Sequence, residues 1–196
     1  MILPIVAYGE KILKTKAVDI TYGYPELKKL INDMWAPMYN ANGVGIAAPQ
    51  IGKSIRLFVI DASPFSEDKE ISDDEISTLK NFKKVFINPK IIDETGDECN
   101  FIEGCLSIPD IREDIKRKEK ITIKYYNESF EEIELELEGL AARVVQHEYD
   151  HIEGVLFIDK LSSLKKKLLK GKLNDISKGK IKTEYKMRYP QGKIKR

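Results

Sequence analysis

Two histidines four residues apart, His147 and His151, are the only histidines in this chain of 196 residues, and the glutamate Glu148 lies between them. On an α-helix, side chains four positions apart lie one above the other, so both imidazoles could bind one cation while Glu148 points toward its open coordination position. Short motifs also arise by chance, and the competing interpretation is a pair of ordinary hydrogen-bonded histidines. We favour a metal site, which still needs a third protein ligand.

The third ligand decides the class of metal site. Zinc peptidases with this motif use a histidine or glutamate further along the chain, but there is no third histidine, and Glu153 lies on the opposite side of a continuing helix. Upstream, the segment EGCLSIP at residues 103–109 contains Cys105. One thiolate and two imidazoles would leave one position for water, as in catalytic sites. Without its neighbours, Cys105 would more often be a buried thiol than a ligand.

Three separated segments resemble, in the same order, the motifs of the peptide deformylase family: GVGIAAPQ at residues 43–50, EGCLS at residues 103–107 and QHEYDH at residues 146–151. The resemblance implies a metal-dependent hydrolase that removes the formyl group from the N-terminal N-formylmethionine of nascent polypeptides and releases formate. It also implies one divalent ion bound by Cys105, His147 and His151. Fe²⁺ is implied as the native ion, with Zn²⁺, Ni²⁺ or Co²⁺ able to occupy the site.

The same resemblance implies roles for five further residues. Glu148 is expected to act as the general base and then to return the proton to the leaving amine. The side chain of Gln50 and the backbone N–H of Leu106 are expected to stabilise the negative oxygen of the tetrahedral intermediate. Glu103 and Arg117 are expected to pair and to orient the metal ligands. The alternative for this pair is an ordinary surface ion pair, which would contribute little.

Small and branched residues are expected to line the substrate cleft. Gly43 and Gly45 suit a loop pressed against the substrate backbone, where a Cβ would not fit. Val44, Val144 and Leu106 are expected to line the pocket for the methionine side chain, although the same residues would also suit a plain core. By itself, the glycine-containing segment is more typical of a flexible turn between a helix and a strand.

These residues depend on elements that bring them together. Residues 139–154 have helical composition, and both histidines continue an apolar stripe along that helix, which places them inside the protein. Residues 24–38 predict an earlier helix, and Ser162 or Ser163 could cap a last one. Strands are expected over residues 55–61, 84–92 and 121–137, the last as a hairpin. We therefore expect an α+β fold in which mainly antiparallel sheets pack around a central helix that carries the HExxH motif.

Charge is distributed unevenly along the chain. The formal net charge is +1, but residues 160–196 hold 14 Lys and Arg against 2 acidic residues, a net charge of +12. We expect one catalytic domain over residues 1–175, with an acidic surface insertion at residues 63–81, followed by a basic tail at residues 176–196. The basic end would either bind ribosomal RNA electrostatically or only increase solubility.

The composition, with 42% apolar and 33% charged residues, is typical of a soluble globular protein. No segment approaches the apolar run of about 20 residues that spans a bilayer, and the N-terminus lacks the pattern of a secretory signal. We therefore expect a cytoplasmic monomer with N-formylmethionyl peptides and the ribosome as partners and no membrane association. Two alternatives remain, a zinc peptidase that does not use Cys105 and a non-catalytic metal-stabilised module that binds nucleic acid.

Overall fold

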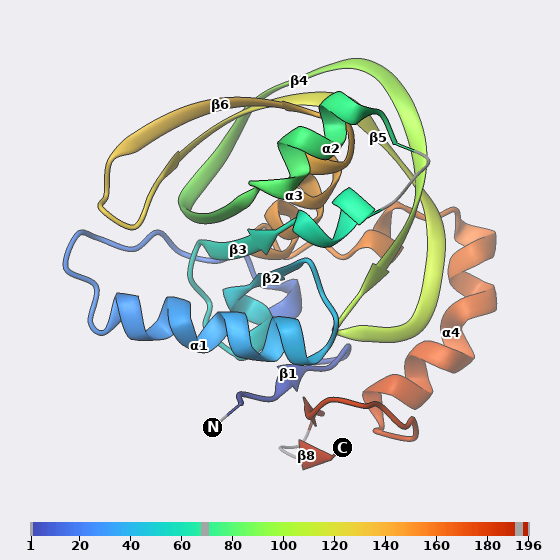
Figure 1. The fold of residues 1–196 in the computed structure, drawn as a ribbon. Coiled ribbons are helices and arrows are strands. Elements are labelled where there is room, and N and C mark those ends of the chain that lie inside the picture. Colours follow the sequence, from blue (N-terminus) through green and yellow to red (C-terminus); the bar gives the residue numbers. More distant parts are fainter. Residues whose placement is uncertain (1, 68–70, 191–193, 196) are drawn as a thin grey trace.

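The computed structural model describes residues 2–67, 71–190 and 194–195 and contains a five-stranded sheet. The strands follow the order β2–β3–β4–β5–β6, and every neighbouring pair is antiparallel (Figure 1). The strands are β2 (Gly45–Ala47), β3 (Leu57–Asp61), β4 (Lys83–Cys105), β5 (Ile108–Tyr126) and β6 (Glu132–Glu138). The hairpin expected over residues 121–137 corresponds to the end of β5 and to β6.

Helix α3 (Gly139–Ile152) carries the HExxH motif and lies in the middle of the molecule, enclosed by the sheet (Figure 1). Its small and branched residues, such as Ala142 and Val145, are fully buried in a cluster with Phe58 and Phe86. Burying apolar area of this kind is the main force that holds a helix on a sheet. The predicted α+β fold, with antiparallel strands around a central helix, is confirmed.

The β4–β5 hairpin is much longer than the strand expected over residues 84–92. Strand β4 continues to Cys105, and its pairing with β5 contains several register shifts, including one between Gly104 and Cys105. Such irregularities bend a two-stranded ribbon, and the hairpin curves around α3 in Figure 1. This curvature brings Cys105 to the side of α3 from which the histidines project.

Three further α-helices and four short 3₁₀ helices surround the sheet in the described part of the chain. The α-helices are α1 (Leu27–Asn40), α2 (Asp73–Lys80) and α4 (Ser163–Ser177), and the 3₁₀ helices are η1 (Lys11–Lys14), η2 (Ala48–Ile51), η3 (Ser63–Glu67) and η4 (Phe157–Lys160). Ser162 caps α4, since its hydroxyl accepts a hydrogen bond from the backbone N–H of Lys165. Among the described residues, no helix combines the length and the apolar character needed to cross a membrane.

The segment expected as an acidic insertion, residues 63–81, forms η3 and α2, and its residues 68–70 lie outside the described part of the structure. Apolar side chains anchor it, since Leu79 is fully buried in the same cluster as α3 and Phe65 and Ile71 pack against that cluster. A carboxylate oxygen of Glu75 also accepts a hydrogen bond of 2.7 Å from the backbone N–H of Leu140, in the first turn of α3. The first N–H groups of an α-helix have no acceptor within the helix, so this hydrogen bond from α2 pairs one of them at the N-terminus of α3.

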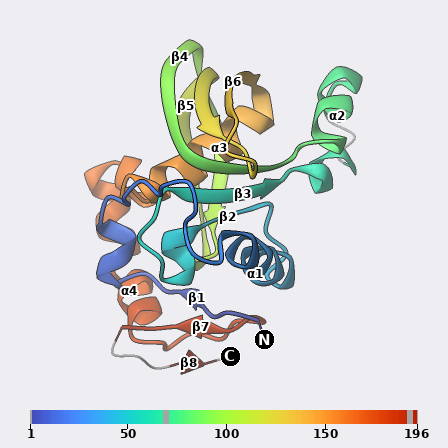
Figure 2. The ribbon, with the colours of Figure 1, turned by 90° about the vertical axis from the view of Figure 1, so that its left-hand side faces the viewer.

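The segment expected as a basic tail, residues 176–196, packs on the rest of the protein through part of its length. The proposed boundary at residue 175 falls inside α4, and β7 (Met187–Arg188) pairs in parallel with β1 (Ile5–Val6). Strand β8 (Ile194–Lys195) pairs with β7, and Figure 2 shows these three short strands side by side at one edge of the molecule. Residues 191–193 and 196 lie outside the described part. Apolar residues among the lysines cause this packing, since Met187 and Tyr189 are buried.

Candidate active site

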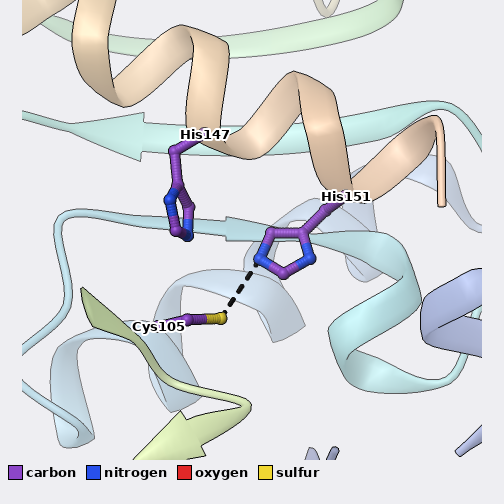
Figure 3. A group of neighbouring side chains, drawn as sticks. All are labelled: Cys105, His147 and His151. Atoms are coloured by element: carbon purple, nitrogen blue, oxygen red, sulfur yellow. Dashed lines mark hydrogen bonds between the residues drawn. The ribbon is translucent and has the colours of Figure 1, made fainter. Parts of the chain in front are cut away.

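Cys105, His147 and His151 converge on one point between the tip of β4 and helix α3 (Figure 3). One ligand atom from each lies within 4.8 Å of the other two, and the Cys105 Sγ to His151 Nε2 distance is 3.3 Å. In a tetrahedral site with bonds of about 2.3 Å to sulfur and about 2.0 Å to nitrogen, a sulfur and a nitrogen ligand lie about 3.5 Å apart. The spacing and the donor types therefore fit one divalent metal ion.

Burial prepares His151 for metal binding. His151 is 1% exposed and Cys105 is 9% exposed. Burial lowers the pKa of His151 well below its ordinary value, and the nearby His147 lowers it further. His151 is therefore neutral near pH 7, which is the form of imidazole that binds a metal.

Glu103 is the centre of a buried hydrogen-bond network behind His147. Its carboxylate accepts hydrogen bonds from Nε and Nη2 of Arg117, at 2.7 and 2.9 Å, and lies 2.9 Å from Nδ1 of His147. Burial by itself would raise the pKa of Glu103, but the hydrogen bonds from Arg117 and His147 outweigh it and lower the pKa well below its ordinary value. The predicted pair of Glu103 and Arg117 is therefore buried and bidentate, unlike a surface ion pair.

Two members of this network were not predicted. Arg143, one turn before His147 on α3, is buried and donates to Glu103 at 3.2 Å and to the carbonyl of Ile115 at 3.0 Å. Asp150 accepts a hydrogen bond of 2.7 Å from Arg117. One sequence signal could have predicted the role of Arg143. It lies four residues before His147 on an otherwise apolar helix face, and a buried arginine there needs a buried partner.

Glu148 points into the same site from α3. It is 4% exposed, and its Oε2 atom has no hydrogen-bond partner among the described residues. Burial raises the pKa of Glu148 to about 7. A buried carboxylate oxygen without a partner is costly, which indicates that a water molecule, a metal-bound group or substrate normally occupies the adjoining space.

Gly43 and Gly45, which were predicted to border the substrate, lie against two residues of the site. A Cβ on Gly45 would lie 2.6 Å from Oε1 of Glu148, and a Cβ on Gly43 would lie 2.8 Å from Cδ1 of Leu106. Both distances are shorter than van der Waals contact. The structure therefore gives a reason for glycine at these positions, which is room for Glu148 and Leu106.

Gln50, in η2, has its side-chain amide oriented by the backbone. Its Oε1 accepts a hydrogen bond of 2.8 Å from the N–H of Ala47, which leaves Nε2 directed toward Ser107 Oγ at 3.3 Å and Cys105 Sγ at 3.6 Å. Leu106 lies in the turn that joins β4 to β5, immediately after Cys105. Both predicted hydrogen-bond donors are therefore adjacent to the candidate metal ligands.

The predicted pocket residues lie in the apolar core that surrounds the site. Val144 is 7% exposed and Val44 packs against the same cluster, whereas Leu106 packs against a neighbouring one. The glutamate considered as a peptidase-type ligand, Glu153, forms ion pairs with Arg56 and Lys16. The structure thus brings Cys105, and not Glu153, into the metal-binding cluster.

Known proteins match this chain over nearly its whole length. A family model described as polypeptide deformylase matches residues 2–167. The peptide deformylase of Christiangramia forsetii is 60% identical over 193 residues, covering 98% of each chain, and that of Flavobacterium johnsoniae is 55% identical with the same coverage. A crystal structure of a peptide deformylase from Legionella pneumophila has a TM-score of 0.76 at 38% identity, covering 92% of this chain and 98% of the other. The chain belongs to the peptide deformylase family.

Proposed function

We propose that Cys105, His147, His151 and Glu148 form the centre at which this chain removes the formyl group from N-formylmethionyl polypeptides. The chain is a hydrolase, and its reaction adds water to the formyl carbon, breaks the bond from that carbon to the amine nitrogen and releases formate. The observation that carries the assignment is the convergence of one thiol and two imidazoles beside a buried carboxylate. We further propose that the enzyme works in the cytoplasm, where nascent chains emerge, as a monomer whose single chain supplies the whole site.

One divalent ion would be held by Cys105 Sγ and by one nitrogen from each imidazole. When bound, such an ion polarises a carbonyl group and lowers the pKa of a water molecule. Thiolate and imidazole ligands suit Fe²⁺, Zn²⁺, Ni²⁺ and Co²⁺, so the ligand set alone does not choose among them. We propose Fe²⁺ as the native ion, as the family resemblance implies, with Zn²⁺ as a less active occupant.

Glu148 would accept the proton of the attacking water and then deliver it to the leaving amine. Two observations support both roles: Oε2 of Glu148 has no hydrogen-bond partner among the described residues, and Gly45 leaves room for Oε1. The Gln50 amide and the Leu106 N–H would donate to the carbonyl oxygen as it becomes negative. Because the amide oxygen of Gln50 accepts a hydrogen bond from Ala47, the amide nitrogen faces the site without any change in the Gln50 side-chain conformation.

Glu103 would fix the orientation of His147. A hydrogen bond from Nδ1 of His147 to Glu103 leaves Nε2 free for the ion, and it makes the imidazole a stronger ligand. Arg117 donates to both oxygens of the Glu103 carboxylate, and Arg143 donates to one of them. The family resemblance further implies which residues border the substrate. Gly43 and Gly45 would lie along its backbone, and Val44 and Val144 would contact the methionine side chain.

Exchange of the metal tests the proposed cofactor. Metal-free protein should release no formate above background from a formyl-methionyl peptide, and reconstitution with Fe²⁺ under anaerobic conditions should restore the reaction. Zn²⁺ should restore it less well. Formate release and metal content are measured on the same samples. A Zn²⁺ form at least as active as the Fe²⁺ form would contradict the choice of iron and leave the deformylase assignment intact, whereas inactivity of every metal form would contradict the assignment itself.

We also propose that α4 docks on ribosomal RNA. Its outer face carries the exposed residues Lys167, Lys170 and Lys172, together with Leu164 and Leu168, which are 69% and 74% exposed. Clustered lysines bind a phosphate backbone mainly through the release of counterions, so the affinity falls steeply with salt. The excess of positive charge at this end of the chain supports the proposal.

A double variant tests this docking surface. Lys167→Ala with Lys170→Ala should weaken co-sedimentation with ribosomes and reduce the slope of log affinity against log salt by about two, because each phosphate contact contributes about one unit. Lys28→Ala with Lys53→Ala removes two exposed lysines elsewhere and should leave binding unchanged. Equal binding by both double variants, or binding insensitive to salt, would contradict docking through α4.

A further inference from the structure

A tyrosine from the C-terminal segment contacts the loop that follows the cysteine ligand. The hydroxyl of Tyr185 donates a hydrogen bond of 2.8 Å to the backbone carbonyl of Leu106. Tyr185 also packs against two of the three apolar clusters. The contact joins residues 79 positions apart in the chain, and charge counting alone had assigned this segment to a basic tail.

The chain on either side of Tyr185 is held in place. The backbone N–H groups of Ile5 and Ala7 donate to the carbonyls of Lys186 and Arg188, at 2.9 and 2.8 Å. Figure 2 shows the resulting pairing of β7 with β1. Before this strand, the hydroxyl of Thr183 donates to the carbonyl of Tyr185 at 2.8 Å. The Tyr185 hydroxyl therefore projects from a fixed backbone toward Leu106.

The turn that Tyr185 contacts is short and restrained on several sides. Leu106 and Ser107 are the two residues between β4 and β5. The carbonyl of Ser107 accepts a hydrogen bond of 2.9 Å from the N–H of Tyr8, and the Ser107 hydroxyl lies 3.3 Å from Nε2 of Gln50. The hydrogen bond from Tyr185 adds a restraint on the carbonyl of Leu106 itself. In a two-residue turn, fixing this carbonyl limits rotation of the Leu106 backbone, including its N–H.

We propose that Tyr185 is a positioning residue for deformylation, and that its hydroxyl holds Leu106 so that the backbone N–H of Leu106 faces the developing oxyanion. The inference rests on the role proposed above for Leu106. An oxyanion donor is effective only if it is in place before the charge develops, and a displacement of about 1 Å can reduce the rate by up to about 100-fold. Because this interaction strengthens in the transition state, its loss should lower kcat more than it changes KM.

The test is Tyr185→Phe, which removes one hydroxyl and keeps the ring. We expect kcat for a formyl-methionyl peptide to fall by about tenfold, and KM to stay within about twofold, as for a misplaced transition-state contact. Metal content and thermal midpoint should match those of the wild type. The matched control is Tyr126→Phe, whose ring packs against one of the same apolar clusters and whose hydroxyl donates to the exposed Glu132 in the β5–β6 hairpin. This control should keep wild-type kcat.

The outcomes separate this inference from the proposed function. Wild-type kcat in Tyr185→Phe, with formate released normally by the wild type, would overturn the inference and leave the proposed function standing. Equal losses of kcat in both variants, with equal losses of thermal stability, would also overturn it, because the loss of activity would then follow from general destabilisation and not from the position of Leu106. Absence of formate release by metal-loaded wild-type protein would remove the proposed function and the inference together.

Discussion

Glu148→Ala protein should bind its metal ion as the wild type does and yet release formate about 10²- to 10⁴-fold more slowly, the range typical for loss of a general acid–base group. None of the three candidate metal ligands changes in this variant, so metal affinity has no reason to fall. The reaction, however, loses the only carboxylate that the structure places beside the metal-binding cluster without a full set of hydrogen bonds among the described residues. Metal content and single-turnover formate release are measured on the same preparation.

Two companion variants sharpen this test. Glu148→Gln keeps the shape of the side chain but cannot accept a proton, so it should be nearly as inactive as the alanine variant. Glu138→Ala removes an exposed glutamate next to the same helix, which pairs only with the exposed Lys120 among the described residues, and it should keep full activity. Substantial activity in Glu148→Gln would show that proton transfer at this position is not required and would remove Glu148 as the base.

Local sequence signals predicted the elements that carry the motifs. The helix expected over residues 139–154 is α3, and the serine expected to cap the last helix does so. The strand expected over residues 55–61 is present as β3. These elements have regular apolar periodicity and clear end signals, so their prediction needs no knowledge of distant residues.

The second half of β4 had no such signal. Residues 93–104 are rich in Asp, Glu, Asn and Gly, which disfavour strands, and the strand prediction therefore ended near residue 92. Pairing with β5 imposes the extended conformation, with register shifts that no local pattern encodes. The position of Cys105 was thus inferable from the family motif and not from the strand pattern.

Long-range contacts account for the other residues that were missed. Arg143 binds the carbonyls of Cys99 and Ile115, from β4 and β5, and these partners exist only after the hairpin has closed over α3. The pairing of β1 with β7 joins residues about 180 positions apart, and the alternating lysines obscured the apolar side chains that drive it. That pairing also brings Tyr185 to Leu106, and no local sequence pattern predicts this contact either.

Cys105→Ser should cost the protein its metal. A thiolate is a strong, negatively charged ligand, whereas a serine hydroxyl stays protonated near neutral pH and binds such ions weakly. Since loss of an outer partner of a ligand already lowers metal affinity by about 10- to 100-fold, we expect loss of the ligand itself to exceed about 100-fold. Competition with a chelator measures the affinity, and circular dichroism shows whether the fold is retained.

The other cysteine supplies the matched control. Cys99 is exposed, and its Sγ lies 3.1 Å from Arg143, away from the ligand cluster. Cys99→Ser should therefore keep wild-type metal affinity. The comparison also separates the two classes of metalloenzyme that share the HExxH motif, because a zinc peptidase with its third ligand elsewhere would keep its ion in Cys105→Ser. Wild-type metal affinity in that variant would contradict the ligand set, and with it the geometry on which the roles of Glu148, Gln50 and Leu106 depend.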